Sequence, residues 1–175
     1  MKLDSDDFEL FGVPRRQSQD RAQLDERWRD LQAKVHPDRF ASDGAAAQRL
    51  AMQWAVRVNE AYQRLKDPLR RAAYLCELQG ASIDAENNTA MPAGFLMQQM
   101  EWREAVVEAK ASKDEAKLDQ LATDKQREEK LLFAKLAEQL GVSISMSDAR
   151  ETVRKLRFLE KLGEEIDIAA EEIES

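Results

Sequence analysis

The 175-residue sequence contains one cysteine and one histidine. The single thiol, Cys76, excludes an internal disulfide and any metal site built from several cysteines. One imidazole and one thiol are also too few ligands for zinc. We therefore expect a protein of the reducing cytoplasm that holds no metal or other cofactor, with Cys76 as a buried structural thiol.

Glycine and proline are scarce, at 6 and 4 residues, and no apolar run approaches the ~20 residues that a membrane span needs. The N-terminal MKLDSDDFEL is acidic and lacks the apolar core of a signal peptide. Hydrophobic content of 43%, charged content of 35% and many helix-favouring residues predict a soluble, all-α protein. A net charge of −7 argues against nucleic acid as a partner, and we expect no membrane partner either.

Charge is distributed unevenly along the chain. Residues 1–80 carry a net charge of +1, and residues 81–175 carry −8. Residues 81–92, ASIDAENNTAMP, are polar and show no periodicity, which is typical of a linker. The sequence therefore predicts a domain over 1–80, a linker over 81–92 and a second domain over 93–175, with different surfaces for two kinds of partner.

The first domain shows the pattern of a helical hairpin with short flanking helices. A short helix ends at Gly12, and a longer one begins near Asp20 and ends before Pro37. Asp67-Pro68 opens a fourth helix that extends to Gln79. The apolar stripes of the two long helices are Leu24, Trp28, Leu31 and Val35, then Leu50, Trp54, Val58, Ala61 and Leu65.

The second domain contains three longer helical stretches with short connections, which predict an antiparallel three-helix bundle. The first covers about 93–111. The second opens at Ser112-Lys113-Asp114-Glu115, which fits a capping box, and ends near Gly141. Ser147-Asp148 can cap the third, which extends to about Glu172.

The only histidine lies in the tripeptide His36-Pro37-Asp38, between the two hairpin helices. Taken alone, it is most simply a loop histidine that precedes a proline. However, a proline-stiffened loop at a hairpin tip presents side chains at low ordering cost. Arg27 and Lys34 are seven residues apart and lie on one side of the preceding helix, so this cationic face suits an acidic protein partner. No catalytic set accompanies His36, and we do not expect an enzyme.

Three segments carry a specific resemblance: DDFELFGVP, LDERWRDLQAKVHPDRF and VNEAYQRLKDPLRRAAYL. Together they resemble a J-domain of the DnaJ class over about residues 4–80. The resemblance implies that His36, Pro37 and Asp38 engage the ATPase domain of a DnaK-type chaperone and stimulate ATP hydrolysis. Arg39 stands where lysine is usual, which keeps the charge and changes the hydrogen-bond geometry. The residues that match the last segment of the pattern are Asn59, Ala61, Tyr62, Leu65, Asp67, Pro68, Arg71 and Tyr74.

The helix over 93–111 has two apolar faces on a helical wheel of about 100° per residue. One face is the expected bundle core, and the other is edged by carboxylates and is a candidate protein-binding patch. Packing against the linker or the first domain explains the second face equally well, and the glutamates alone are ordinary solubility charges. The core face contains Phe95, Trp102, Val106 and Ala109, and the second face contains Leu96, Met97, Met100, Glu101, Glu104 and Glu108.

Phe158 lies about 160° from the centre of the apolar stripe of the third bundle helix. It is therefore either packed against another element or an exposed binding anchor. The stripe itself consists of Ala149, Val153, Leu156, Leu159 and Ile166.

FLMQQMEWREAVVEA and RKLRFLEKL resemble the C-terminal domain of the HscB family, the J-domain co-chaperones of iron–sulfur cluster assembly. The resemblance implies a bundle that binds the scaffold protein IscU and a partner chaperone of the HscA/DnaK type. Met100 stands where leucine is frequent, a volume-conserving change. The implied scaffold-binding residues are Leu96, Met97, Met100, Glu101, Glu104, Glu108 and Phe158.

Eukaryotic members of the family tend to carry a cysteine-rich N-terminal extension and a targeting segment, and their absence favours a bacterial cytoplasmic form. Two other functions stay open. A general J-domain protein would usually have a glycine/phenylalanine-rich segment and a zinc-binding cysteine module, and this sequence has neither. The second alternative is a helical structural protein without a chaperone partner. Measuring whether the chain accelerates a DnaK-type ATPase would distinguish this alternative.

Overall fold

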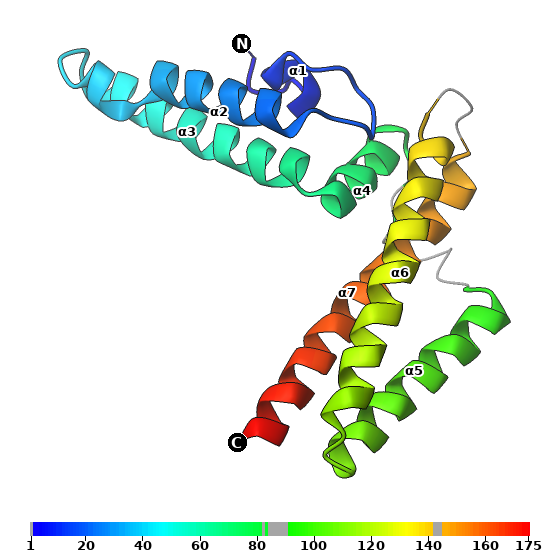
Figure 1. The fold of residues 1–175 in the computed structure, drawn as a ribbon. Helices are drawn as coiled ribbons and strands as arrows, with labels where there is room; N and C mark the ends of the chain where they lie inside the picture. Colours follow the sequence, from blue (N-terminus) through cyan, green and yellow to red (C-terminus); the bar gives the residue numbers. More distant parts are fainter. Residues whose placement is uncertain (1, 82, 84–90, 142–144) are drawn as a thin grey trace. The chain divides into compact units, whose positions relative to one another are not determined.

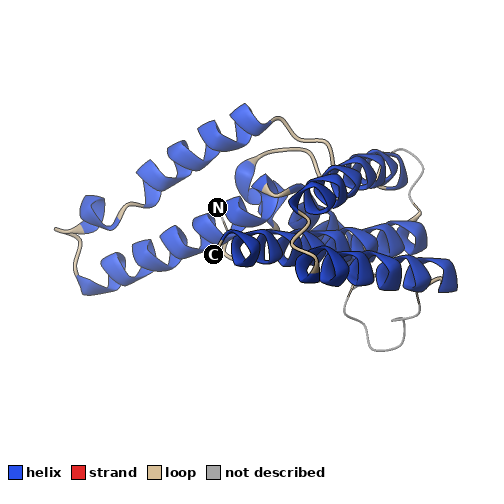
Figure 2. Ribbon diagram, turned by 60° about the horizontal axis from the view of Figure 1, so that its bottom comes forward, coloured by secondary structure: helices blue, strands red, loops and turns tan. Residues whose placement is uncertain are grey.

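The computed structural model describes all residues except 1, 82, 84–90 and 142–144. Within this part of the chain every regular element is a helix, as Figure 2 shows, which confirms the all-α prediction. The chain divides into two compact units, Met1–Leu75 and Cys76–Ser175. Among the residues that the structure describes, no helix has both the length and the hydropathy of a membrane span.

The first unit contains the predicted hairpin. α2 (Arg21–Val35) and α3 (Ala45–Lys66) lie antiparallel and are joined by the short 3-10 helix η1 (Pro37–Phe40) (Figure 1). α1 (Asp7–Phe11) packs against both of them, and α4 (Pro68–Leu78) follows α3. Asp20 caps α2, and Asp67 caps α4 by accepting from the N–H groups of its second and third residues. These caps supply acceptors for backbone donors that have no partner within the helix.

Side chains of α3 hold α2 in register. The Tyr62 ring stacks on Trp28 with the ring centroids 4.9 Å apart. Asn59 Oδ1 accepts hydrogen bonds from Trp28 Nε1 at 3.0 Å and from Gln32 Nε2 at 2.6 Å. Leu50, predicted as part of the α3 core stripe, is exposed instead. At this end of α3 the helix packs against η1, and the adjacent Ala51 is the buried residue instead.

A buried carboxylate attaches α1 to the rest of the first unit. Asp7 is fully buried, and its Oδ1 lies 2.7 Å from Arg57 Nη1 while Oδ2 lies 3.5 Å from Arg64 Nε. Its backbone N–H donates to the Tyr74 hydroxyl at 3.0 Å. The ion pair gives the buried charge the partner that it needs away from water.

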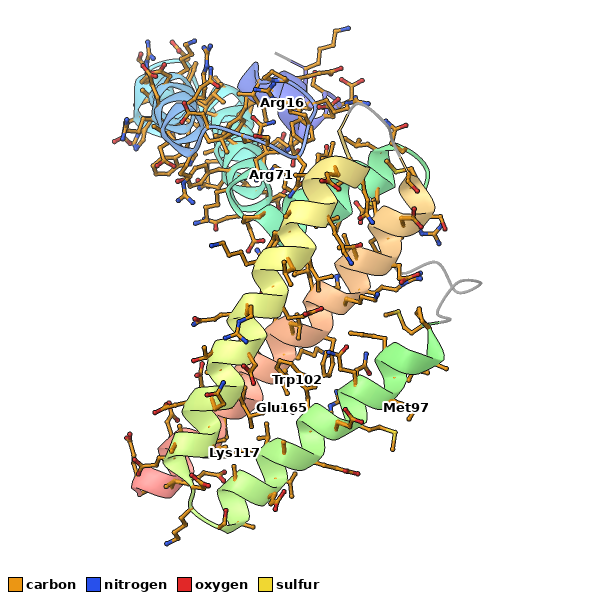
Figure 3. All side chains as sticks on the ribbon, turned by 45° about the vertical axis from the view of Figure 1, so that its right-hand side comes forward. Arg16, Arg71, Met97, Trp102, Lys117 and Glu165 are labelled. Carbon is orange, nitrogen blue, oxygen red and sulfur yellow. The ribbon has the colours of Figure 1, made fainter. Side chains whose placement is uncertain are left out.

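The second unit contains α5 (Ala93–Ala111), α6 (Glu115–Gln139) and α7 (Met146–Glu174), together with the end of α4. The three long helices pack pairwise as the predicted bundle. The whole predicted stripe of α7 is buried, as are Phe95, Val106 and Ala109 of α5. Trp102, expected in the core, is half-buried and lies between α5 and α7 (Figure 3).

Two predicted helix starts differ from the structure. Ser112 ends α5, and Asp114 caps α6 by accepting from the Lys117 N–H at 3.0 Å. α7 begins at Met146, after Ser145 in the N-cap position, so Ser147-Asp148 lies inside the helix. In both cases the sequence offers several candidate cap residues close together, and the chain path decides which of them precedes the helix.

The division between the units falls inside α4 rather than at residue 80. Most of the predicted linker, namely residue 82 and residues 84–90, lies outside the described residues. Ile83 is described, and it is buried in the second unit, where its carbonyl accepts from Arg154 at 3.1 Å. At least this position is therefore a packed part of the bundle.

Candidate functional site

The first candidate surface is the tip of the α2–α3 hairpin. His36 has φ −60° and ψ 127°, an extended conformation that ends α2, because the ring of Pro37 disfavours helical geometry at the preceding residue. Pro37 then opens η1, in which the Arg39 N–H donates to the His36 carbonyl at 3.0 Å. The sequence thus forces the chain to reverse direction here and holds His36, Pro37 and Asp38 in one conformation.

The tip presents a donor and an acceptor to solvent. The backbone N–H of Asp38 donates to His36 Nδ1 at 3.3 Å, so the neutral ring carries its proton on Nε2. The Asp38 carboxylate lies 3.7 Å from Nδ1, beyond hydrogen-bond reach. The two side chains are 57% and 92% exposed, which leaves the Nε2–H donor and the carboxylate available to another molecule.

Three cations accompany the tip. Arg39 Nη1 donates to the carbonyl of Ala33 at 3.0 Å, which satisfies a free acceptor at the end of α2. Arg27 and Lys34 are exposed, and both line a hollow of about 260 Å³ between α1 and α2. Neither forms an ion pair within the described part of the chain. Glu9 and Asp30 line the same hollow, so these two unpaired cations lie among carboxylates.

The second candidate surface is the face of α5 that points away from the bundle. Leu96, Met97 and Met100 are 46–64% exposed, and Figure 3 shows Met97 on the side opposite α6 and α7. Glu101, Glu104 and Glu108, also exposed, share this face. The structure thus brings together these six of the seven predicted scaffold-binding residues.

The three glutamates are neighbours on the helix surface. Glu104 is three residues from Glu101 and four from Glu108, and like charges at these spacings destabilise a helix by about 0.2–0.5 kcal/mol per pair. None of the three forms an ion pair with the described residues. Packing within the bundle therefore does not explain why carboxylates occupy these positions.

Phe158 is the exception among the predicted scaffold-binding residues. Its side chain is only 8% exposed, and its ring meets Phe95 of α5 edge-on, with centroids 5.6 Å apart. The Arg103 guanidinium covers the ring at 5.4 Å. The interpretation of Phe158 as an exposed anchor is therefore wrong. One side of α7 packs against α6, and the side that carries Phe158 packs against α5. Phe158 instead supports α5 from beneath.

Val107 is an exposed residue of α5 that the sequence analysis did not select. It is 68% exposed and lies about 20° from Leu96 and Met100 on the helical wheel. The helical wheel places Val107 on the second apolar face, so the sequence does contain the information needed to find it. Val107 was missed because it directly follows the core residue Val106.

Redox and metal chemistry have little support in the described residues. Cys76 is fully buried, and burial raises the pKa of its thiol to about 11, which leaves it protonated and unreactive at neutral pH. No group of three or more histidine, cysteine, aspartate or glutamate residues in the described chain could hold a metal ion.

Comparison with known proteins gives one consistent result. Residues 91–167 match the family model described as the HscB C-terminal oligomerisation domain. A protein of Paraburkholderia phymatum, named co-chaperone protein HscB homolog, is 50% identical over 99% of this chain and 98% of its own length.

Solved structures give the same result. The chaperone HscB from Vibrio cholerae has a TM-score of 0.82 at 37% identity, covering 97% of this chain and 99% of that one. The human co-chaperone protein HscB has a TM-score of 0.88 at 27% identity, covering 96% of this chain and 83% of its own. The chain therefore belongs to the HscB family, the J-domain co-chaperones of iron–sulfur cluster assembly.

Proposed function

We propose that this protein is a bipartite adaptor that brings an IscU-type scaffold protein to an HscA/DnaK-type chaperone and stimulates the ATPase of that chaperone. The α5 face binds the scaffold, and the His36-Pro37-Asp38 tip engages the chaperone. The observation that carries the proposal is the exposed apolar and acidic face of α5, on a helix whose opposite face is core.

The tip supports the chaperone part of the proposal. Its backbone is held by the hydrogen bonds from Asp38 to His36 Nδ1 and from Arg39 to the end of α2, so docking costs little ordering entropy. The Nε2–H group and the Asp38 carboxylate then provide one donor and one acceptor for polar groups of the ATPase domain. Arg27 and Lys34 steer an acidic partner toward the same side of α2.

Binding both partners at once raises the concentration of the scaffold at the peptide-binding site of the chaperone. ATP hydrolysis, which takes place in the chaperone, then locks the chaperone onto the scaffold and promotes cluster transfer. This chain contributes binding and positioning and is not itself an enzyme. Its single, buried thiol suits the reducing cytoplasm, which we propose as its location.

The chaperone role is tested by His36→Gln. The amide keeps a polar group of similar size but cannot reproduce both the Nδ1 acceptor and the Nε2 donor at the positions of the imidazole. We expect the loss of ATPase stimulation in a steady-state assay with the HscA-type chaperone, with unchanged affinity for the scaffold. Full stimulation by the variant would mean that the tip does not act on the chaperone.

The scaffold role is tested by Leu96→Ala and Met100→Ala. Each should weaken binding of the IscU-type scaffold by about 1–3 kcal/mol if the side chain is buried in the complex. Leu131→Ala is a matched control, because Leu131 is 57% exposed on α6. Equal affinities for all three variants, measured by calorimetry on folded protein, would place scaffold binding elsewhere.

A further inference from the structure

Val107 extends the apolar part of the α5 face by two turns. Leu96, Met100 and Val107 lie within about 40° of one another around the helix. Leu96 and Val107 are eleven positions apart, which corresponds to about 16 Å along the axis. The three side chains therefore form a straight row, which we call the apolar row, and Val107 is its most exposed member.

The two edges of the apolar row differ in charge. Glu104 and Glu108 lie along one edge, and Glu101 lies just beyond them. On the other edge Arg103 lies 4.0 Å from Glu165 of α7, and Lys110 forms an ion pair with Glu172 of α7. Both cations thus have a carboxylate partner on α7, whereas the three carboxylates of α5 have no ion-pair partner in the described chain.

We infer that Val107 is a third anchor for the scaffold and that the scaffold segment which docks here carries an apolar row about 16 Å long with basic side chains along one edge only. This inference rests on the proposed function. Because only one edge of the surface carries unpaired charge, a segment with this pattern can dock in one direction but not in the reverse direction. The α5 face therefore sets the orientation of the bound scaffold as well as its affinity.

A second copy of this chain fits the surface poorly. Two α5 faces brought together antiparallel would place the carboxylates of one copy against those of the other, and like charges in contact across an interface oppose association. A parallel pair would instead place them against the edge that carries Arg103 and Lys110. The cations that would relieve this repulsion, Arg103 and Lys110, already pair with α7. A basic and apolar partner is complementary where a second copy is not.

The test measures calorimetric binding of the IscU-type scaffold to the full chain and to Val107→Ala. We expect binding to weaken by about tenfold to fifteenfold, since the change removes about two methyl groups from a buried contact. Ile168→Ala is the control, because Ile168 is exposed on α7 to a comparable degree, 55%, and should change affinity less than about twofold. Val107→Asp should weaken binding more, because it adds a carboxylate within the apolar row.

The salt dependence of binding separates the two edges. Glu104→Gln removes one unpaired carboxylate and should reduce the loss of affinity with added salt, whereas Val107→Ala should leave that slope unchanged. If Leu96→Ala weakens binding but Val107→Ala does not differ from Ile168→Ala, the apolar row ends at Met100 and this inference is wrong while the proposed function stands. If the unaltered protein binds no scaffold, or if it dimerises through these residues, both fail.

Discussion

Replacing Phe158 with alanine tests whether its ring belongs to the core of the bundle. The ring is enclosed between α5 and α7, where it meets Phe95 edge-on and lies under the Arg103 guanidinium. Its removal leaves a cavity at the site where α5 attaches to the rest of the second unit. Neighbouring side chains can fill such a cavity only in part, because protein interiors are close-packed.

The expected loss of stability is large. Phenylalanine-to-alanine changes in cores cost about 3–5 kcal/mol, a range that includes lost transfer energy and the cavity left behind. At about 4 kcal/mol, a unit of roughly one hundred residues should lose about 15–30 °C in its melting temperature. Phe158→Leu keeps most of the volume and should cost about 1.5 kcal/mol or less.

Thermal and urea unfolding, followed by far-ultraviolet circular dichroism, measures these changes directly. Leu131→Ala, an exposed substitution in the same unit, should leave the melting temperature almost unchanged. The reasoning fails if Phe158→Ala melts with the unaltered protein and yet binds the scaffold more weakly. That result would make the ring a direct binding anchor and contradict its position under α5.

Three further predictions concern single residues. Asp7→Ala should lower the stability of the first unit by about 3 kcal/mol in urea denaturation, because it leaves the Arg57 guanidinium without its buried partner; a loss below about 1 kcal/mol would show that the pair is not needed. Arg39→Ala should reduce ATPase stimulation while costing only about 1 kcal/mol of stability, since one hydrogen bond to the end of α2 is lost. Burial raises the pKa of the Cys76 thiol from 9.0 to about 11, so its contribution to stability is present below pH 9 and declines as the pH rises to about 11. Stability measured across that range should decline less steeply in Cys76→Ala, and parallel curves would contradict this assignment.

Periodicity predicted the helices of both units well, because each long helix buries an apolar stripe along most of its length. The stripe of α7, from Ala149 to Ile166, is buried throughout, and the exposed second face of α5 was also visible on the wheel. These features depend only on residues within one helix. The tip was predictable for the same reason, since Pro37 fixes the backbone of His36 from the adjacent position.

The errors arise where the outcome depends on a second element. Phe158 lies far from the α7 stripe, yet it is buried because α5 covers that side of α7. Leu50 continues the α3 stripe, yet it is exposed while its neighbour Ala51 is buried, because η1 packs against this end of α3. The Asp7–Arg57 pair joins residues fifty positions apart, and no local pattern announces such a contact.

The two edges of α5 explain how one helix can be both a structural element and a binding surface. Phe95 and Phe158 anchor its inner face, and the ion pairs from Arg103 and Lys110 to α7 hold one edge. The like-charged glutamates cost the helix some stability, but they lie on the opposite edge and leave these contacts intact. Their charge can therefore be altered without loss of the fold, so the binding of a basic partner can be tested separately from the stability of the bundle.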